Sequence, residues 1–162
     1  MPPLYVIDTH ALLTLPTLCT SEDRVYSFFD LLTEEISAGN LTFPNLAMQD
    51  CKKFAEGEFI YTWVKAASAH RKQYRVDNGW QEDVLGTCEE LADFDDECEQ
   101  TPVLVASLAL MVSDTGRSTV VVTEDNRELP NRMCLGDACQ ALGLASMSTA
   151  DMIHAMGMET YL

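Results

Sequence analysis

Two aspartates stand directly after short apolar runs that have the composition of β-strands. Asp8 follows Leu4–Ile7, and Asp125 lies just beyond Thr119–Thr123. If both runs are parallel strands, both carboxylates lie at the carboxyl edge of one sheet, where open α/β sheets bind their ligands. Two carboxylates there repel each other unless a cation neutralises them, and hard oxygen ligands suit Mg²⁺ or Mn²⁺. The pair therefore predicts a divalent-metal site, although a single aspartate of this kind is more often a helix cap or a turn residue.

The segments that must position these carboxylates alternate between strands and helices. The expected strands are 4–7, 41–43, 119–123 and 144–147, and the residues between Asp8 and Thr20 are expected to form a loop. Helices are expected from Thr20 to the Gly39-Asn40 stop, in three pieces between residues 45 and 92, from Thr101-Pro102 to residue 112, at 133–142, and after a cap at Thr149. Strands separated by helices imply a sheet covered on both faces. We therefore predict one domain, 1–162, with an α/β fold: a three-layer α/β/α sandwich around a mostly parallel sheet of four or five strands.

Composition narrows the class of protein. Apolar residues make up 47% of the 162 residues, which suits a globular domain with a sizeable core. No apolar run approaches the roughly 20 residues that span a bilayer, and the first residues lack a basic start and an apolar stretch, so we expect a cytoplasmic protein without a membrane partner. None of the six cysteines forms a C-x-x-C pair, which argues against zinc and favours reduced, mostly buried thiols.

The formal charge of −16 argues against general nucleic-acid binding. Six of the ten basic residues nevertheless lie between Lys52 and Arg75, so a local basic face could hold RNA. The best-placed charges in this region are Lys65, Arg71, Lys72 and Arg75, with Trp63 and Tyr74 as candidate stacking partners. The other interpretation is a solvated helix face, with the two aromatics in the core.

Three other classes of α/β protein lack support in the sequence. A haloacid-dehalogenase phosphatase would have a second aspartate at His10. A receiver domain would have paired acids before its first loop and a lysine after its last strand, and neither is found. A nucleotide-binding domain would have a glycine-rich turn after the first strand, but Asp8-Thr9-His10-Ala11 contains no glycine.

The order of several short motifs resembles that of a PIN domain over nearly the whole chain. Tyr5–Leu12 resembles the opening strand, acid and small hydroxyl residue of that family, and Val121–Asp125 resembles its late strand, hydroxyl and acid. Phe43–Asp50 resembles the segment in which a proline precedes a helix that carries an acid, usually Glu. Thr101–Ala106 resembles the start of the buried helix, and the order and spacing of residues 134–151 resemble those of the family's C-terminal segment.

The resemblance implies a divalent-metal-dependent endoribonuclease, a hydrolase of single-stranded RNA that is related to VapC-like toxins. Asp8, Asp50 and Asp125 would then be the catalytic and metal-binding residues for one or two Mg²⁺ or Mn²⁺ ions, with Thr9 and Thr123 positioning water or a metal ligand. Glu124 is a weaker candidate. The implied partners are RNA, an antitoxin protein and a second copy of the chain.

This sequence departs from the family pattern at two positions. Thr101 stands where an acid usually opens the buried helix, so either Glu99, Asp96 or Asp95 takes the place of the missing acid or the site is weaker. Asp50 is one methylene shorter than the usual Glu. His10 is interpreted as a structural or loop residue. The alternative function is a catalytically weak or inactive PIN-like module that binds RNA or protein.

Overall fold

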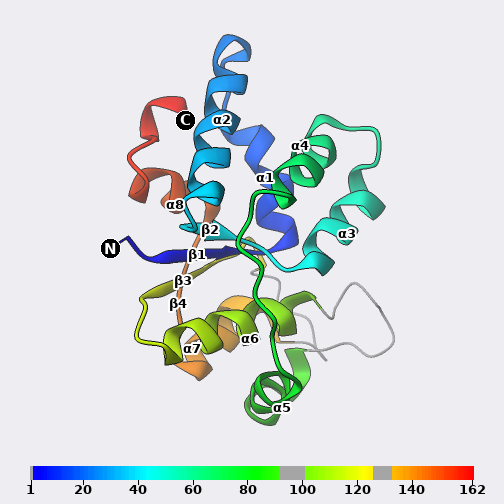
Figure 1. Cartoon of the computed structure of the whole chain (residues 1–162), viewed down its shortest axis with the longest axis vertical. Coiled ribbons are helices and arrows are strands. Elements are labelled where there is room, and N and C mark those ends of the chain that lie inside the picture. The colour runs from blue at the N-terminus through cyan, green and yellow to red at the C-terminus, as the bar shows by residue number, and fades with distance from the viewer. Residues whose placement is uncertain (1, 92–100, 126–132) are drawn as a thin grey trace.

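A four-stranded sheet, parallel throughout, lies at the centre of the protein (Figure 1). The computed structural model describes residues 2–91, 101–125 and 133–162. The strands are β1 (Leu4–Ile7), β2 (Leu41–Thr42), β3 (Thr119–Val122) and β4 (Ala145–Met147), in the order β2-β1-β3-β4. The α/β sandwich predicted from the alternation of strands and helices is confirmed, with four strands.

Eight α-helices cover this sheet in the described part of the chain. They are α1 (Thr9–Leu18), α2 (Val25–Ser37), α3 (Asn45–Ala55), α4 (Phe59–Ser68), α5 (Asn78–Thr87), α6 (Thr101–Asp114), α7 (Leu135–Leu142) and α8 (Thr149–Ala155). Short 3₁₀ turns occupy Glu22–Arg24, Glu89–Leu91 and Glu159–Tyr161. None of the described helices is long and apolar enough to cross a membrane.

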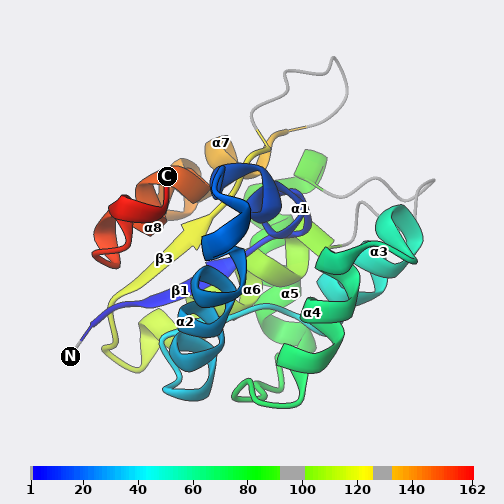
Figure 2. The same cartoon turned by 90° about the horizontal axis from the view of Figure 1, so that it is seen from above.

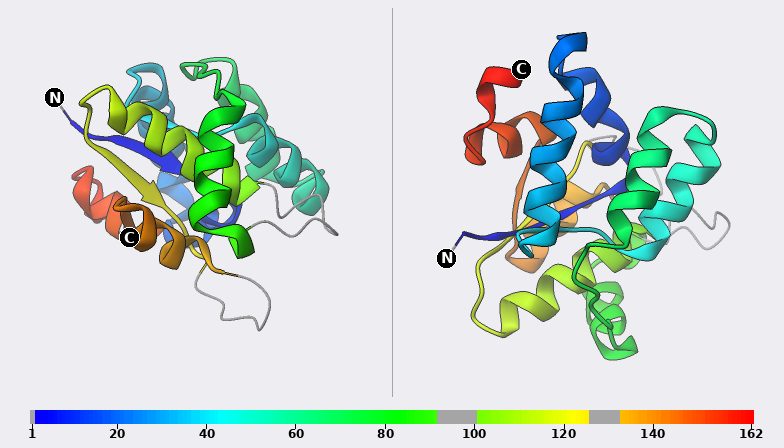
Figure 3. Two further views of the ribbon diagram at one scale, coloured as in Figure 1. Left: turned by 90° about the horizontal axis from the view of Figure 1, so that it is seen from below. Right: turned by 45° about the horizontal axis from the view of Figure 1, so that its top comes forward.

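The helices form two layers, one on each face of the sheet. Helices α1–α4 and α8 cover one face, and α5–α7 cover the other (Figures 1 and 3). Alternate residues of β1 supply both cores: Tyr5 and Ile7 pack with the first layer, Leu4 and Val6 with the second. Burial on both faces explains why β1 is a continuous apolar run rather than an alternating one.

The chain reverses its direction of travel across the sheet between β1 and β3. From β1 it moves outward to β2, and from β3 it moves outward on the other side to β4. The two central strands pair from Leu4 with Thr119 to Ile7 with Val122, and Figure 2 shows them side by side. Such a switch in strand order opens a crevice at the carboxyl ends of the two strands. Asp8 and Asp125 follow these two strands.

One predicted element is wrong. Residues 9–18, expected to form a loop, are helix α1. Asp8 starts this helix as its N-cap, because the Asp8 side chain accepts a hydrogen bond from the Ala11 N–H. Pro16 lies inside the helix and interrupts the spacing of apolar residues expected of a helix. The cap at Asp8 is therefore the signal in the sequence that marks this helix.

Two predicted caps also differ from the structure. Ser148, not Thr149, caps α8 by accepting from the Asp151 N–H, and Thr149 is the first helical residue. Thr101, predicted to cap α6 from the position before its first residue, is itself the first residue of that helix. The end of α7 follows the prediction: Gly143 takes a left-handed backbone conformation, with φ of 73°, which glycine adopts without strain.

Candidate functional site

Asp8 is held rigidly at the carboxyl end of β1. Its backbone N–H donates to the carbonyl of Val122 at 3.0 Å, which extends the pairing of β1 with β3. Its Oδ1 accepts from the Ala11 N–H at 2.8 Å, and its Oδ2 accepts from the hydroxyl of Thr123. The carboxylate is therefore both a helix cap and a member of a side-chain network, with only 4% of the residue exposed.

Thr123 connects Asp8 with Asp125. Its hydroxyl donates to Asp8 and accepts from the backbone N–H of Asp125 at 2.9 Å. Asp125 in turn accepts, through Oδ2, from the Leu135 N–H at the first turn of α7, at 3.0 Å. The expected role of Thr123, to position water or a metal ligand through its hydroxyl, stays a prediction; in the structure this hydroxyl bonds to Asp8 and to the Asp125 N–H.

Asp50 occupies a second, adjacent network. Its Oδ2 accepts from the hydroxyl of Thr9 at 2.9 Å and from that of Thr101 at 2.5 Å. These bonds join three segments that are distant in sequence: the start of α1, the middle of α3 and the start of α6. Asp8 belongs to the first network and Thr9 to the second, and because the two residues are consecutive, the networks lie next to each other.

The charge on Asp8 is costly in this setting. Burial raises the pKa of Asp8 from its usual 3.8 to about 7. The hydrogen bonds from Thr123 and Ala11 lower this pKa, and the charges of Asp125 and Glu124 raise it. Burial is the largest of these effects, so the raised pKa of Asp8 reflects mainly its buried position, and the charge of Asp125 makes a smaller contribution.

A pocket of about 410 Å³ opens beside Asp125, and Asp8 is not among its lining residues. Its lining includes Asp125, Glu124 and His10, together with Leu13, Thr14 and Thr17 of α1. Glu124, which the sequence ranked as a weaker candidate, both lines this pocket and accepts from the Thr149 N–H at 2.8 Å. His10 lies on α1 rather than in a loop, with its ring 6.2 Å from that of Phe54. In the sequence, His10 lies two residues after Asp8, and Glu124 directly precedes Asp125; this proximity is what pointed to both residues.

The oxygen-rich donor set has the chemistry that a hard divalent cation requires. Three buried carboxylates and the hydroxyls of three buried threonines, Thr9, Thr101 and Thr123, gather at the carboxyl edge of the sheet. Within the described ranges, however, no group of three His, Cys, Asp or Glu side chains is arranged to hold a metal ion. The donors suit a cation by type, and Asp8 and Asp125 are connected through the Thr123 hydroxyl. Glu99, Asp96 and Asp95, the predicted replacements for the acid missing at Thr101, lie outside the described residues.

The predicted RNA-binding residues lie in two places. Lys65 is exposed in the last turn of α4, whereas Arg71, Lys72 and Arg75 lie in the segment that joins α4 to α5. Lys72 places its Nζ 5.4 Å from the centre of the Tyr74 ring. Trp63 is buried and donates its Nε1–H to the Thr33 hydroxyl at 3.0 Å, so for this residue the interpretation that places the aromatics in the core is the one that holds.

The thiols near the site are protected. The five described cysteines, Cys19, Cys51, Cys88, Cys134 and Cys139, are buried and unpaired by disulfides. Burial, together with the smaller effect of the charges of Asp50 and Asp8, raises the pKa of Cys51 to about 12. Cys139, which packs in the core on the α5–α7 side, has its pKa raised by burial to about 12 as well. Cys51 and Cys139 therefore stay protonated at neutral pH and serve as small apolar core residues.

Comparison with known proteins identifies a family but no activity. A family model described as "Domain of unknown function (DUF4411)" matches residues 5–160. No curated protein and no solved structure matches the chain. The match spans the sheet, both helical layers and all three site aspartates.

Proposed function

The chain belongs to the DUF4411 family, and we propose that it is a metal-dependent endoribonuclease of PIN type that hydrolyses single-stranded RNA. The observation that carries this proposal is the Asp8–Thr123–Asp125 network at the carboxyl ends of the two central strands. That position is the ligand crevice of an open α/β sheet. The RNA substrate, an antitoxin partner and a second copy of the chain are parts of the same proposal.

The raised pKa of Asp8 supports a cationic ligand. Burial is the main reason that a charge on Asp8 is costly, and the nearby charges of Asp125 and Glu124 add to that cost, which a bound cation would offset. Asp8 and Asp125 would hold the ion, and Asp50 would lie nearby, oriented by Thr9 and Thr101. When bound, Mg²⁺ or Mn²⁺ supplies Lewis-acid chemistry that activates water and stabilises negative charge on a phosphodiester.

The chain's own residues have three separate tasks in this proposal. Thr123 fixes the orientation of Asp8, because its hydroxyl donates to one carboxylate oxygen while the Ala11 N–H holds the other. The Leu135 N–H fixes Asp125 in the same way. Lys65, Arg71, Lys72 and Arg75 are proposed to attract the RNA backbone toward an otherwise acidic protein.

We expect weak binding at one metal site, with Mn²⁺ supporting activity better than Mg²⁺. The described residues offer a carboxylate pair rather than a closed group of three, and Mg²⁺ demands a near-ideal octahedral arrangement of ligands. Thr101 contributes a hydroxyl where an acid would add charge.

The test is cleavage of a labelled single-stranded RNA by purified protein, with and without Mn²⁺. Asp8→Asn and Asp125→Asn should abolish cleavage, because each converts a carboxylate ligand into a neutral amide. Asp30→Asn is the matched control, because Asp30 is an exposed carboxylate on α2. Cleavage at the wild-type rate by both site variants would show that the centre is wrongly assigned.

The second candidate is a PIN-like module that binds RNA or protein without cutting. The hydrogen bonds of Asp50 favour this second candidate. The hydroxyls of Thr9 and Thr101 both donate to its Oδ2, so that oxygen is already occupied and is less available to a metal ion. In this case wild-type protein would bind RNA in the presence of Mn²⁺ and leave it intact.

A further inference from the structure

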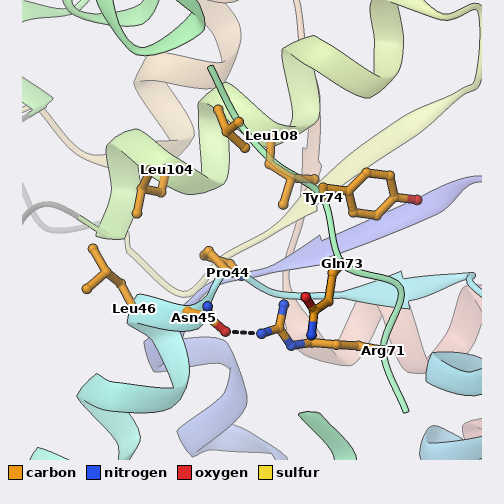
Figure 4. Close-up of a pocket in the computed structure, with 9 residues that line it drawn as sticks. Pro44, Asn45, Leu46, Arg71, Gln73, Tyr74, Leu104 and Leu108 are labelled. Carbon is orange, nitrogen blue, oxygen red and sulfur yellow. Dashed lines mark hydrogen bonds between the residues drawn. The ribbon is translucent and has the colours of Figure 1, made fainter. Parts of the chain in front are cut away.

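A second pocket lies beside the start of α3, away from the Asp8–Asp125 pair. It has a volume of about 210 Å³, and Figure 4 shows its two unlike sides. The polar side is formed by Asn45, Arg71 and Gln73, and the apolar side by Leu46, Leu104 and Leu108. We refer to it as the Arg71 pocket.

Arg71 is held in this pocket entirely by neutral groups. Its Nη1 donates to the backbone carbonyl of Phe43 at 3.2 Å, its Nη2 donates to Oδ1 of Asn45, and its guanidinium lies 5.4 Å from the centre of the Phe43 ring. Its Nε is buried and donates to no acceptor in the ranges that the structure describes. No carboxylate in those ranges contacts it, in a chain with 26 acidic residues. A fixed arginine without an acidic partner is a ready contact for an anion.

The first turn of α3 adds a second source of positive potential. Pro44 is the N-cap of this helix and makes no side-chain capping bond, so no side chain of the N-cap satisfies the first N–H groups. Asn45 and Leu46, the first two helical residues, both line the pocket. The N-terminal end of a helix favours an anion through these N–H groups and through the helix dipole.

The pocket is one helical turn from the carboxylate networks. Leu46 precedes Asp50 by four residues on α3, and Leu104 follows Thr101 by three on α6, so each pair lies on one face of its helix. The hydrogen bond from Thr101 to Asp50 joins the two helices at that point. A ligand that extends from the Arg71 pocket along these two faces would run toward Asp50.

We propose that the Arg71 pocket binds one phosphate group of an RNA strand. The RNA assignment rests on the proposed nuclease function, whereas phosphate recognition rests on Arg71 and the start of α3. At about 210 Å³ the pocket is smaller than the roughly 300 Å³ at which sites for whole small molecules begin, which suits a single group better than an entire nucleotide. The phosphate is either an internal phosphodiester or a terminal 5′-phosphate.

The variant that tests this proposal is Asn45→Asp. It keeps the size of the side chain and places a carboxylate where Oδ1 already accepts from Arg71, so it neutralises the arginine without removing its support. Asn78→Asp is the matched control, because Asn78 is the exposed first residue of α5 and the change adds the same charge at a helix start.

Binding is measured by fluorescence anisotropy with single-stranded RNA of roughly ten nucleotides. EDTA is present so that no strand is cut, and each sequence is made with a 5′-phosphate and with a 5′-hydroxyl. Asn45→Asp should weaken binding roughly tenfold relative to Asn78→Asp and reduce the salt slope by about 0.7. Urea unfolding should show that Asn45→Asp is at least as stable as the wild type.

Each result has one meaning for the pocket. Loss confined to the 5′-phosphorylated strand identifies a terminal phosphate, and equal loss for both strands identifies an internal phosphodiester. Equal binding by Asn45→Asp and Asn78→Asp to both strands overturns the proposal. Because the assay requires neither metal nor cleavage, a failed nuclease assay with an intact Asn45→Asp effect would refute only the proposed function.

Discussion

Asp8→Asn is predicted to stabilise the metal-free protein while it removes the proposed activity. Asparagine serves as an N-cap as well as aspartate does, so its side-chain oxygen can keep the hydrogen bond from the Ala11 N–H. The new amide N–H group faces the Thr123 hydroxyl, whose oxygen can accept as well as donate. The variant therefore removes a buried negative charge and keeps the local hydrogen bonds.

The size of this effect follows from the pKa of Asp8. A rise from 3.8 to about 7 means that ionised Asp8 costs the fold on the order of 4 kcal/mol relative to an exposed carboxylate. Because the folded state holds its proton to higher pH than the unfolded state does, this cost develops as pH rises from about 4 to about 7. Between about pH 5 and pH 8, the stability of Asp8→Asn should gain on that of the wild type by up to about 3 kcal/mol.

The assay is urea unfolding in EDTA at pH 5 and at pH 8, monitored by circular dichroism. Asp30→Asn, which changes an exposed carboxylate, should stay within about 0.5 kcal/mol of the wild type at both. Mn²⁺ at pH 8 should stabilise the wild type and leave Asp8→Asn unchanged. If Asp8→Asn is destabilised by the same amount at both pH values, the charge of Asp8 is not a cost and the electrostatic reasoning fails.

Three further predictions concern the neighbours of this pair. Thr101→Asp should destabilise the metal-free protein by about 2 kcal/mol, because a second carboxylate would meet Asp50 where a hydroxyl now donates. Mn²⁺ should reverse this loss, and urea unfolding that shows the same loss with and without Mn²⁺ would contradict the prediction. Thr123→Val should weaken Mn²⁺ binding by about tenfold, since it removes the group that orients a ligand, and calorimetry showing unchanged affinity would contradict that role. Cys51 and Cys139 should react with Ellman's reagent only at the rate of unfolding, because burial keeps both thiols protonated, and rapid labelling of the native protein at these two residues would be inconsistent with it.

The strands and their order of appearance could be predicted because β1 and β3 are buried on both faces. Each is a short, β-prone apolar run that ends in a polar residue, and the helices between them impose parallel pairing. Helix α1 could not be predicted in the same way. Its signal was the Asp8 cap alone, and Pro16 and the threonines around it interrupt the pattern expected of a helix.

The site aspartates could be named from the sequence, but their hydrogen bonds could not. Asp8 and Asp125 follow from the rule that parallel strands end at one edge of the sheet. The bonds from Thr9 and Thr101 to Asp50 depend on how α1, α3 and α6 pack, which no local pattern encodes. The same holds for Arg71, which looked like one of several surface charges and instead lies in a pocket at the start of α3.

A calorimetric titration with Mn²⁺ tests most directly whether the strand-end carboxylates form a cation site. The wild type and Asp30→Asn should each bind one Mn²⁺ weakly. Asp8→Asn and Asp125→Asn should show no measurable binding, because each loses one of the two buried carboxylates proposed to hold the ion. Mn²⁺ binding of equal affinity and stoichiometry in all four proteins would contradict the assignment of the site to Asp8 and Asp125.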